Sequence, residues 1–413
     1  NNNGSRGFGL FGNGDLLVTG NTAYGHTGNF DTGIDLSRGT ARDNTTYNNH
    51  TGLRLDNRAV AIDNLVYGNS EYGIRSTDSR IEIRKNNVYS NKTGIRLERN
   101  DNLVEQNLVY DNSLHALMLD NADRATLRNN TLYHDSTSGA AIRIQDNTRG
   151  ARMENNIIKV EAGTALFVGK DNQRGFKSDY NLYDLASGVT TVDWAGRILQ
   201  TQKDIFYNTG NDRHSLFTGA LLADIDGADD RLGYEASTGT DNGGDDDFTL
   251  QAGSPGIDAG NPGDYYLAEP GPNGSRINMG AYGNTARAAT GEASGFYILS
   301  PDPFAKYQQG DAVEVRFRGF GFTETERVAA INVGGDSNGT WSYDNFQVTV
   351  DFTSDLNDRE IDTSGVTNPA PDAVYNTFAE ADTGENGFLY DIPLTDGDYE
   401  VRLHFVADTF SSG

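Results

Sequence analysis

Three arginines recur at a fixed interval, and each is the second residue after a glycine that is followed by Leu or Ile. These residues are Arg54, Arg75 and Arg96. A guanidinium group matches a carboxylate with two parallel hydrogen bonds. If the three residues lie one above another, they form a cationic stripe suited to an acidic polymer. The same position in other repeats holds Asp35, Met118, Arg143 and Phe167.

A neighbouring column lies two residues before each of these glycines, or before the small residue in the same position of another repeat, and its charged members alternate in sign. It contains Asp31, His50, Glu71, Lys92 and Leu114. Two interpretations of the paired columns stay open. In one, the charges compensate each other in a surface lattice of weak salt bridges. In the other, the columns form an anion-binding groove, with substrate contacts from Arg54, Arg75, Arg96, Arg143, Glu71 and Asp35.

A catalytic groove of this kind would remove the proton at C5 of a uronate sugar. The reaction needs a cation beside the carboxylate, a base and an acid. The arginines supply the cation, His50 or Lys92 is the candidate base, and Tyr72 is the candidate acid. Three further histidines near turns are His26, His115 and His134. A rival chemistry is hydrolysis by two carboxylates, for which Asp31 and Asp35 are the pair in the groove.

Regular repeats must position these columns. An asparagine returns once every 20–25 residues, an aromatic follows it by three residues, and a small residue opens each repeat. Self-similarity at one period indicates a solenoid. The asparagines are Asn21, Asn44, Asn64, Asn86, Asn107, Asn130 and Asn155, and the aromatics are Tyr24, Tyr47, Tyr67, Tyr89, Tyr110 and Tyr133. The opening residues are Gly9, Gly33, Gly52, Gly73, Gly94, Ala116, Ala141 and Ala165.

Each repeat contains short runs of alternating apolar and polar residues, which is the pattern of a half-buried strand. Residues 52–55 and 81–83 are examples, and Asn, Asp, Gly and Ser lie between the runs. Three strands and three turns per repeat predict a parallel β-helix. Stacked asparagines would then form a hydrogen-bonded ladder, and the tyrosines an aromatic rib. A second polar column holds His26, Asn49, Asn69, Asn91, Asn112 and Asp135.

The coil at residues 86–91, repeated at 107–112, resembles secreted bacterial right-handed parallel β-helix proteins. That superfamily includes pectate lyases, alginate lyases and mannuronan C5-epimerases. The resemblance continues at residues 178–183, 212–216, 254–260 and 278–283, which look like the closing part of such helices. It implies an all-β solenoid that acts on polysaccharide. The Asp-Pro-His-Glu run typical of the epimerases is missing from the sequence.

Composition narrows the function classes. The net charge of −26 argues against nucleic acid as a partner and suits an extracellular protein. The sequence has no cysteine and no visible membrane span. We expect a secreted or cell-surface bacterial monomer with no required cofactor. Because the chain opens on coil-like sequence, Asn1 to Gly4, we also expect it to be a piece of a longer protein.

Four segments follow from changes in pattern. We expect regular coils at 1–170, irregular final coils and capping loops at 171–290, a small β linker at 291–329, and a partial β-sandwich at 330–413. The second segment carries acidic runs. Hard carboxylate oxygens suit calcium, so the candidate ligands are Asp224, Asp226, Asp229 and Asp230. The alternative is a solvated loop.

The last segment is similar to malectin-like carbohydrate-binding domains. The likeness rests on Ile331-Asn332-Val333-Gly334-Gly335, on residues 371–375 and on residues 397–405. Tyr375 and Phe410 match ligand-loop aromatics of that family, whereas Thr409 departs from it. Only the first part of such a domain is matched, so we expect an incomplete β-sandwich.

The sequence therefore predicts an extracellular β-helix joined to a malectin-like sandwich that engages an acidic polysaccharide. Three hypotheses stay open: a lyase or C5-epimerase, a non-catalytic binding module, and a structural stalk or adhesin in which the solenoid is a spacer.

Overall fold

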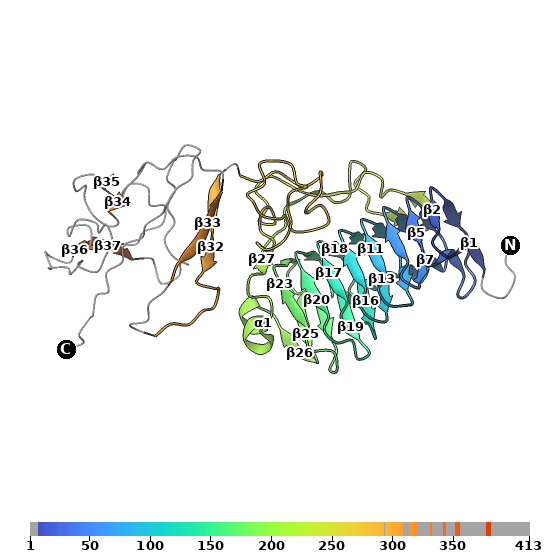
Figure 1. Cartoon of the computed structure of the whole chain (residues 1–413), viewed down its shortest axis with the longest axis horizontal. Helices are drawn as coiled ribbons and strands as arrows, with labels where there is room; N and C mark the ends of the chain where they lie inside the picture. Colours follow the sequence, from blue (N-terminus) through green and yellow to red (C-terminus); the bar gives the residue numbers. More distant parts are fainter. Residues whose placement is uncertain are drawn as a thin grey trace. The chain divides into compact units, whose positions relative to one another are not determined.

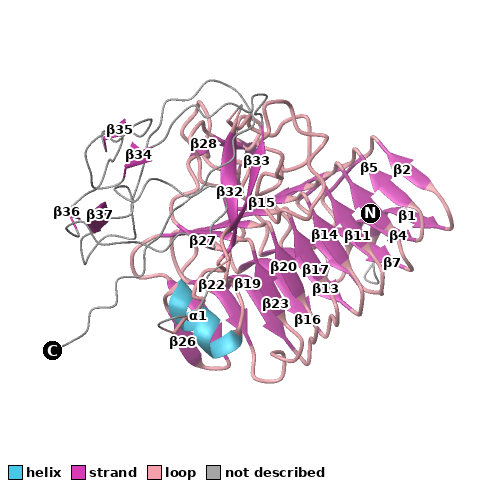
Figure 2. Ribbon diagram, turned by 60° about the vertical axis from the view of Figure 1, so that its left-hand side comes forward, coloured by secondary structure: helices cyan, strands magenta, loops and turns pink. Residues whose placement is uncertain are grey.

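The computed structural model describes residues 7–292, 294–308 and 314–320, together with the backbone of four short strands between residues 331 and 380. The repeats wind into a parallel β-helix with three long sheets, which confirms the all-β solenoid (Figure 1). Consecutive strands of the chain belong to different sheets, so each strand pairs with the equivalent strand of the next coil (Figure 2).

Sheet A has ten strands and presents the arginine column. All its pairings are parallel except the last, β25 with β26. Its strands are β1 (Phe8–Asn13), β4 (Thr32–Ser37), β7 (Thr51–Asp56), β10 (Tyr72–Ser76), β13 (Thr93–Glu98), β16 (His115–Asp120), β19 (Ala140–Gln145), β22 (Thr164–Val168), β25 (Thr190–Trp194) and β26 (Arg197–Leu199).

Sheets B and C form the other two sides of each coil. Sheet B contains β2 (Leu17–Thr19), β5 (Thr40–Arg42), β8 (Val60–Ile62), β11 (Glu82–Arg84), β14 (Leu103–Glu105), β17 (Thr126–Arg128), β20 (Arg152–Glu154) and β23 (Lys177–Asp179). Sheet C contains β3 (Thr22–Tyr24), β6 (Thr45–Tyr47), β9 (Leu65–Tyr67), β12 (Asn87–Tyr89), β15 (Leu108–Tyr110), β18 (Thr131–His134), β21 (Ile157–Val160), β24 (Leu182–Leu185) and β27 (Leu216–Phe217).

The core fills the inside of the coils with aliphatic side chains from all three sheets. On β10, Ile74 is fully buried, whereas the next residue, Arg75, is half-buried and faces out. The opening glycines allow the coils to approach closely. A Cβ atom at Gly73 would lie 2.7 Å from the carbonyl oxygen of Gly94 in the next coil. Removing this apolar surface from water is the main favourable term in folding.

An asparagine ladder runs along the turn between sheets B and C, as the sequence predicts. The Asn86 amide nitrogen donates to Oδ1 of Asn107 at 2.9 Å, and Oδ1 of Asn86 accepts from the backbone nitrogen of Asn64 at 3.0 Å. The same contacts join the successive rungs Asn21, Asn44, Asn64, Asn86, Asn107 and Asn130. The ladder satisfies buried polar groups that water cannot reach.

The prediction that Asn155 is a rung is wrong, because Asn156 takes that place. Asn130 donates to Oδ1 of Asn156, and the ladder continues to Asn181. Asn155 has a φ of 56° and bonds outward to Asp264. Left-handed backbone is common for asparagine just before a rung, as at Asn129 with a φ of 50°. Two consecutive asparagines, Asn155 and Asn156, could each have been the rung, and Asn156 is the one in the ladder.

The tyrosines stack on the outer side of sheet C. Ring centroids are 5.1 Å apart for Tyr47 and Tyr67, and 4.8 Å apart for Tyr89 and Tyr110. Phe248 then packs on Tyr110 at 4.7 Å. Stacked aromatic pairs of this kind add to the energy of burial.

The second polar column forms a second ladder, from the backbone of His26 through Asn49, Asn69 and Asn91 to Asn112. Asp135 was expected to continue it and does not. Strand β18 runs to His134, which is four residues instead of three, so Asp135 lies in the following turn and is exposed. The longer strand is the physical reason for the error.

Residues 218–290 return along the outer side of sheet C and cover the tyrosines. The Asn48 amide donates to Tyr234 Oη at 2.8 Å, Tyr89 Oη donates to Asp241 at 2.7 Å, and the Ala281 nitrogen donates to Thr131 Oγ1 at 3.0 Å. This segment holds four short strands: β28 (Leu222–Asp224), β29 (Tyr234–Glu235), β30 (Thr240–Asp241) and β31 (Asp247–Leu250).

Helix α1 (Gln202–Thr209) follows the last strand of sheet A, and its Ile205 joins the core of the coils. Thr201 caps the helix by accepting from the Asp204 nitrogen, and Gly210 ends it with a φ of 72°. The final rung of the ladder ends beside it, where the Asn181 nitrogen donates to Ser215 Oγ.

The chain divides into two compact units. One comprises residues 1–292 and 298–316, and the other comprises 293–297 and 317–413. The remaining strands are β32 (Gly295–Ser300), β33 (Arg316–Phe320), β34 (Ile331–Asn332), β35 (Ser342–Tyr343), β36 (Phe352–Asp355) and β37 (Thr377–Glu380). Strand β34 pairs with β35, and β36 pairs with β37. The β-sandwich of residues 330–413 stays a prediction.

Candidate functional site

The outward column of sheet A lies in continuous register. Arg75 pairs with Arg54 on one side and with Arg96 on the other. Strands of a sheet are about 4.8 Å apart, so the guanidinium-bearing residues follow one another at that step. We call the whole column the sheet A strip, and it consists of Asp35, Arg54, Arg75, Arg96, Met118, Arg143 and Phe167.

Carboxylates hold the first arginine of the sheet A strip. Nη1 of Arg54 donates to both oxygens of Asp35 at 2.9 Å. Nη2 of Arg54 also lies 3.5 Å from Asp56. The Asp35 side chain is 2% exposed, so this ion pair is largely shielded from water. Asp35 therefore holds Arg54 in place instead of facing solvent.

The next two arginines share one carboxylate. Nε of Arg75 donates to Glu98 Oε1 at 2.9 Å, and Nε of Arg96 lies 3.1 Å from the same oxygen. Arg96 also pairs with Asp120 and donates to the hydroxyl of Tyr72. Both guanidinium groups lie over the Tyr72 ring, at 5.5 and 5.2 Å from its centroid. The result is a compact network of two cations, two carboxylates and a phenol.

Arg143 is held differently. Its Nε donates to the neutral amide oxygen of Gln145 at 2.6 Å, and its guanidinium carbon lies 4.2 Å from the centre of the Phe167 ring. A cation over an aromatic face is attracted by the ring quadrupole. Among the described residues, no carboxylate forms an ion pair with Arg143.

The three predicted catalytic side chains occupy neighbouring strands or turns without touching one another. Lys92 Nζ donates to both oxygens of Glu71, at 2.9 and 3.2 Å. His50 lies 6.1 Å from the ring of Phe30. Tyr72 accepts from Arg96, as described above. An ammonium group that donates to a carboxylate has no lone pair for a proton, which makes His50 the better placed base.

The carboxylates proposed for hydrolysis serve other contacts. Asp31 accepts from the backbone nitrogens of Gly7 at 2.6 Å and Gly28 at 3.0 Å, and Asp35 is bound to Arg54. Both are buried. An inverting or retaining pair needs two carboxyl groups that reach the sugar, and these two are engaged with the protein.

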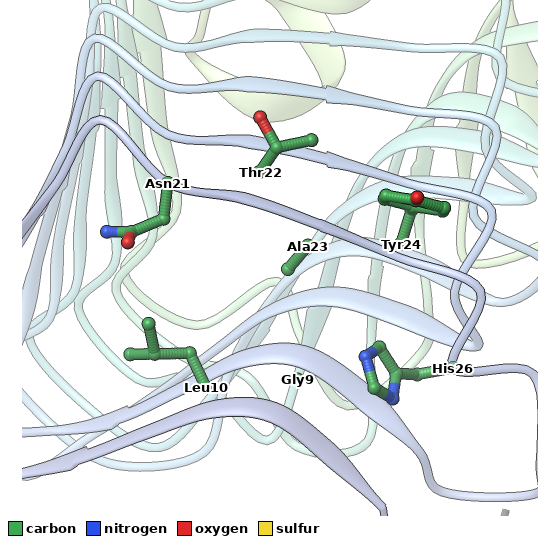
Figure 3. Close-up of a pocket in the computed structure, with 7 residues that line it drawn as sticks. All are labelled: Gly9, Leu10, Asn21, Thr22, Ala23, Tyr24 and His26. Carbon is green, nitrogen blue, oxygen red and sulfur yellow. The ribbon is translucent and has the colours of Figure 1, made fainter. Parts of the chain in front are cut away.

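The further histidines are buried or lie in the first coil. Burial lowers the pKa of His115 to about 4 and also lowers the pKa of His134. His26 lines a cavity of about 290 Å³ in the first coil, between β1 and β3 (Figure 3). Among the described residues, the lining also includes Gly9, Asn21 and Tyr24 and contains no carboxylate.

The candidate calcium ligands lie in the returning segment. Two carboxylates in this part of the segment accept hydrogen bonds from nearby backbone N–H groups. Asp229 accepts from the Arg231 nitrogen, and Asp245 accepts from the Ala228 nitrogen. Among the described residues, no three His, Cys, Asp or Glu side chains gather closely enough to hold a metal ion. Calcium binding by Asp224 and its neighbours stays a prediction.

Sequence reasoning missed the carboxylates that hold the arginines. Asp56, Glu98 and Asp120 lie four residues after the opening residue of their repeats. Two residues farther along a strand, a side chain points to the same face. That spacing was visible in the sequence and could have identified them. The predicted sugar contacts Tyr375 and Phe410 lie outside the described residues.

These features define a parallel β-helix with an asparagine ladder and one charged, partly aromatic face. Residues 32–176 match the family model described as "Right handed beta helix region", which covers most of the regular coils. Comparison with curated proteins and with solved structures gives no significant match. In the described part of the chain, no helix is long and apolar enough to cross a membrane.

Proposed function

We propose that the sheet A strip binds an acidic polysaccharide, as the carbohydrate-contacting face of a secreted bacterial protein. The observation that supports this is the register of Arg54, Arg75 and Arg96, with Arg143 two strands farther on. One uronate sugar per coil matches the strand spacing of about 4.8 Å. The right-handed β-helix is also a fold of polysaccharide-acting enzymes.

The ion pairs of the strip are compatible with binding. Side chains of Arg54, Arg75 and Arg96 are 20–28% exposed. Partly exposed ion pairs, such as Arg75 with Glu98, contribute roughly 0–1 kcal/mol each, so a ligand carboxylate can share or replace Glu98 at small cost. The net charge of −26 repels an acidic polymer at long range. Affinity must therefore come from contacts at the strip.

A matched pair of triple variants tests the proposal. The first is Arg75→Gln, Arg96→Gln and Arg143→Gln on sheet A. The control removes the same charge from arginines that face outward near sheet B, namely Arg84, Arg124 and Arg128, each of which also pairs with a carboxylate. Retention is measured by affinity electrophoresis in gels that contain polygalacturonate, alginate or a neutral glucan.

We expect retention of the wild type in at least one polyuronate gel, loss of it for the sheet A variant, and little change for the control. Mobility is expressed relative to the same protein in a gel without polysaccharide. An equal ratio for all three proteins in every gel would reject carbohydrate binding by this face. That outcome would favour the structural stalk, in which the solenoid is only a spacer.

Turnover of the bound polymer is a second candidate function, favoured by the position of Tyr72. Its hydroxyl accepts from Arg96, and two guanidinium groups lie over its ring. In C5 proton abstraction, Arg75 and Arg96 would neutralise the uronate carboxylate, His50 would take the proton, and Tyr72 would donate one to the leaving oxygen or the opposite face. Ultraviolet absorbance of an unsaturated uronate distinguishes a lyase, and sugar composition distinguishes an epimerase. The Tyr72→Phe variant should abolish either.

Two smaller expectations accompany this proposal. A rise in the melting temperature with calcium, removed by Asp226→Asn, would support a metal in the returning segment. A monomeric mass in light scattering would support action as a single chain. The malectin-like assignment of residues 330–413 would add a second sugar-binding unit.

A further inference from the structure

Unlike the other arginines of the sheet A strip, Arg143 forms no ion pair with a carboxylate among the described residues. Arg54, Arg75 and Arg96 each form an ion pair with at least one carboxylate. Arg143 uses only Nε, which donates to Gln145, and its two terminal nitrogens have no partner among the described residues. A guanidinium group with two free terminal nitrogens can bind a carboxylate through two parallel hydrogen bonds.

Stacking fixes the plane of this free guanidinium group. The Phe167 ring centroid lies 4.2 Å from its central carbon, and Gln145 holds Nε at 2.6 Å. Two contacts on one planar group leave little rotational freedom to lose when a ligand binds. Such preorganisation raises affinity because less ordering is required on binding. In contrast, an incoming carboxylate at Arg75 must compete with Glu98.

The residues on either side of Arg143 are apolar. Met118 precedes it in register and Phe167 follows it, and both are half-buried on the outward face. A sugar ring has apolar C–H faces as well as a polar edge. A chain that follows the axis of the coils would place C–H faces on Met118 and Phe167, and the carboxylate of the sugar between them on Arg143.

Other titratable groups near Arg143 determine the net charge around it. Asp120 is bound to Arg96, and a hydrogen bond with Asp120 raises the pKa of the exposed Asp146. His115 is neutral because burial lowers its pKa. Asp193, the register neighbour of Phe167, accepts from the Gly196 nitrogen at 2.8 Å. Asp146 also interacts electrostatically with Arg143, which partly opposes the rise in the pKa of Asp146. The two do not form an ion pair among the described residues, so the terminal nitrogens of Arg143 stay available to a ligand.

We infer that Arg143, flanked by Met118 and Phe167, is the subsite that anchors the carboxylate of a uronate residue most tightly. Arg54, Arg75 and Arg96 already pair with protein carboxylates and each contribute less to affinity. This inference rests on the proposed binding of acidic polysaccharide by the same face. It names the substrate class, a uronate oligomer with the carboxylate toward sheet A, and assigns specificity to one residue.

Calorimetric titration of the full chain with tetragalacturonate and with tetramannuronate tests the inference. The variants are Arg143→Gln, Arg143→Lys and Phe167→Ala. The matched control is Arg128→Gln, because Arg128 lies on sheet B, outside the strip, and pairs with Glu105. We expect Arg143→Gln to weaken binding about 10-fold or more, because a charge-assisted contact is lost. Arg128→Gln should change affinity about threefold or less, because it removes the same charge away from the strip. Arg143→Lys should recover part of the loss, since it keeps the charge without the bidentate fork.

A carboxyl-reduced tetramer gives a second readout that does not depend on folding of a variant. The wild type should bind it at least about 10-fold more weakly than the uronate, which is the same loss that we expect for Arg143→Gln. Arg143→Gln should bind both tetramers equally. If Arg143→Gln binds the uronate as well as the wild type does, the inference is overturned, although the strip still binds polysaccharide. If the wild type binds neither uronate, the proposed function itself fails.

Discussion

The asparagine ladder gives the sharpest quantitative expectation, through the substitution Asn86→Ala. The side-chain amide of Asn86 forms five contacts. Its oxygen accepts from the backbone and side chain of Asn64, and its nitrogen donates to Ala61, Arg84 and Asn107. Truncation to alanine removes all five at a site that is 1% exposed.

The cost can be worked out from what remains bonded afterwards. The Asn64 amide nitrogen keeps the carbonyls of Ala41 and Ile62, and Oδ1 of Asn107 keeps the backbone nitrogen of residue 86. The backbone N–H of Asn64 loses its acceptor and stays buried. An unsatisfied buried donor costs about 1–3 kcal/mol, and the other lost bonds add roughly 2 kcal/mol. We expect a total of about 3–5 kcal/mol.

Urea unfolding followed by far-ultraviolet circular dichroism measures this loss. The control is Asn208→Ala, whose exposed amide makes one bond to the Asp204 carbonyl at 2.7 Å, and it should change stability by about 0.5 kcal/mol or less. A second variant, Asn86→Asp, keeps the shape but places a carboxylate against three acceptors, so it should be at least as damaging. Equal midpoints for Asn86→Ala and Asn208→Ala would refute the idea that the ladder stabilises the coils.

Three other expectations follow from buried groups. Burial raises the pKa of the Asp212 carboxyl group to about 6. The native state therefore binds a proton at Asp212 more tightly than the unfolded chain does. The free energy of unfolding falls as this proton is lost, between about pH 4 and pH 6. Asp212→Asn should therefore gain stability relative to the wild type between pH 4 and pH 8, by up to roughly 3 kcal/mol, and a difference that is flat with pH would contradict this. Tyr89→Phe removes the bond to Asp241 and should free the returning segment, seen as faster amide exchange at residues 234–248 with the coils unchanged. Gly73→Ala should lower the free energy of unfolding, measured with urea, by about 1–3 kcal/mol, because its Cβ would collide with the next coil. An unchanged free energy of unfolding would mean that the coils can separate there.

Separate variants test the separate carbohydrate proposals, because each variant changes a different part of the coils. Loss of Arg143 tests the anchor, and loss of Tyr72 tests turnover. The sheet B control tests whether net charge alone explains retention. A result at one position does not settle the others.

The repeat period was enough to predict the β-helix, since residues such as Asn64, Asn86 and Asn107 recur at one phase of successive coils. A period of this length, with alternating apolar residues and turn-forming residues between them, has few architectures that bury every apolar side chain. The same phase correctly placed Arg54, Arg75 and Arg96 in register. Local errors arose where a coil changed length, at Asn155 and Asp135.

What only the tertiary structure decided is the identity of contact partners that no local pattern specifies. The sequence determined that arginines would stack, but not that Glu98 would hold two of them while Arg143 is left with a neutral amide. It determined an aromatic rib, but not that residues more than a hundred positions later would return to cover Tyr89. Periodicity encodes the step from one coil to the next, because that contact repeats. A single long-range contact occurs once, so it leaves no period in the sequence, and it is chosen by the packing of the completed coils.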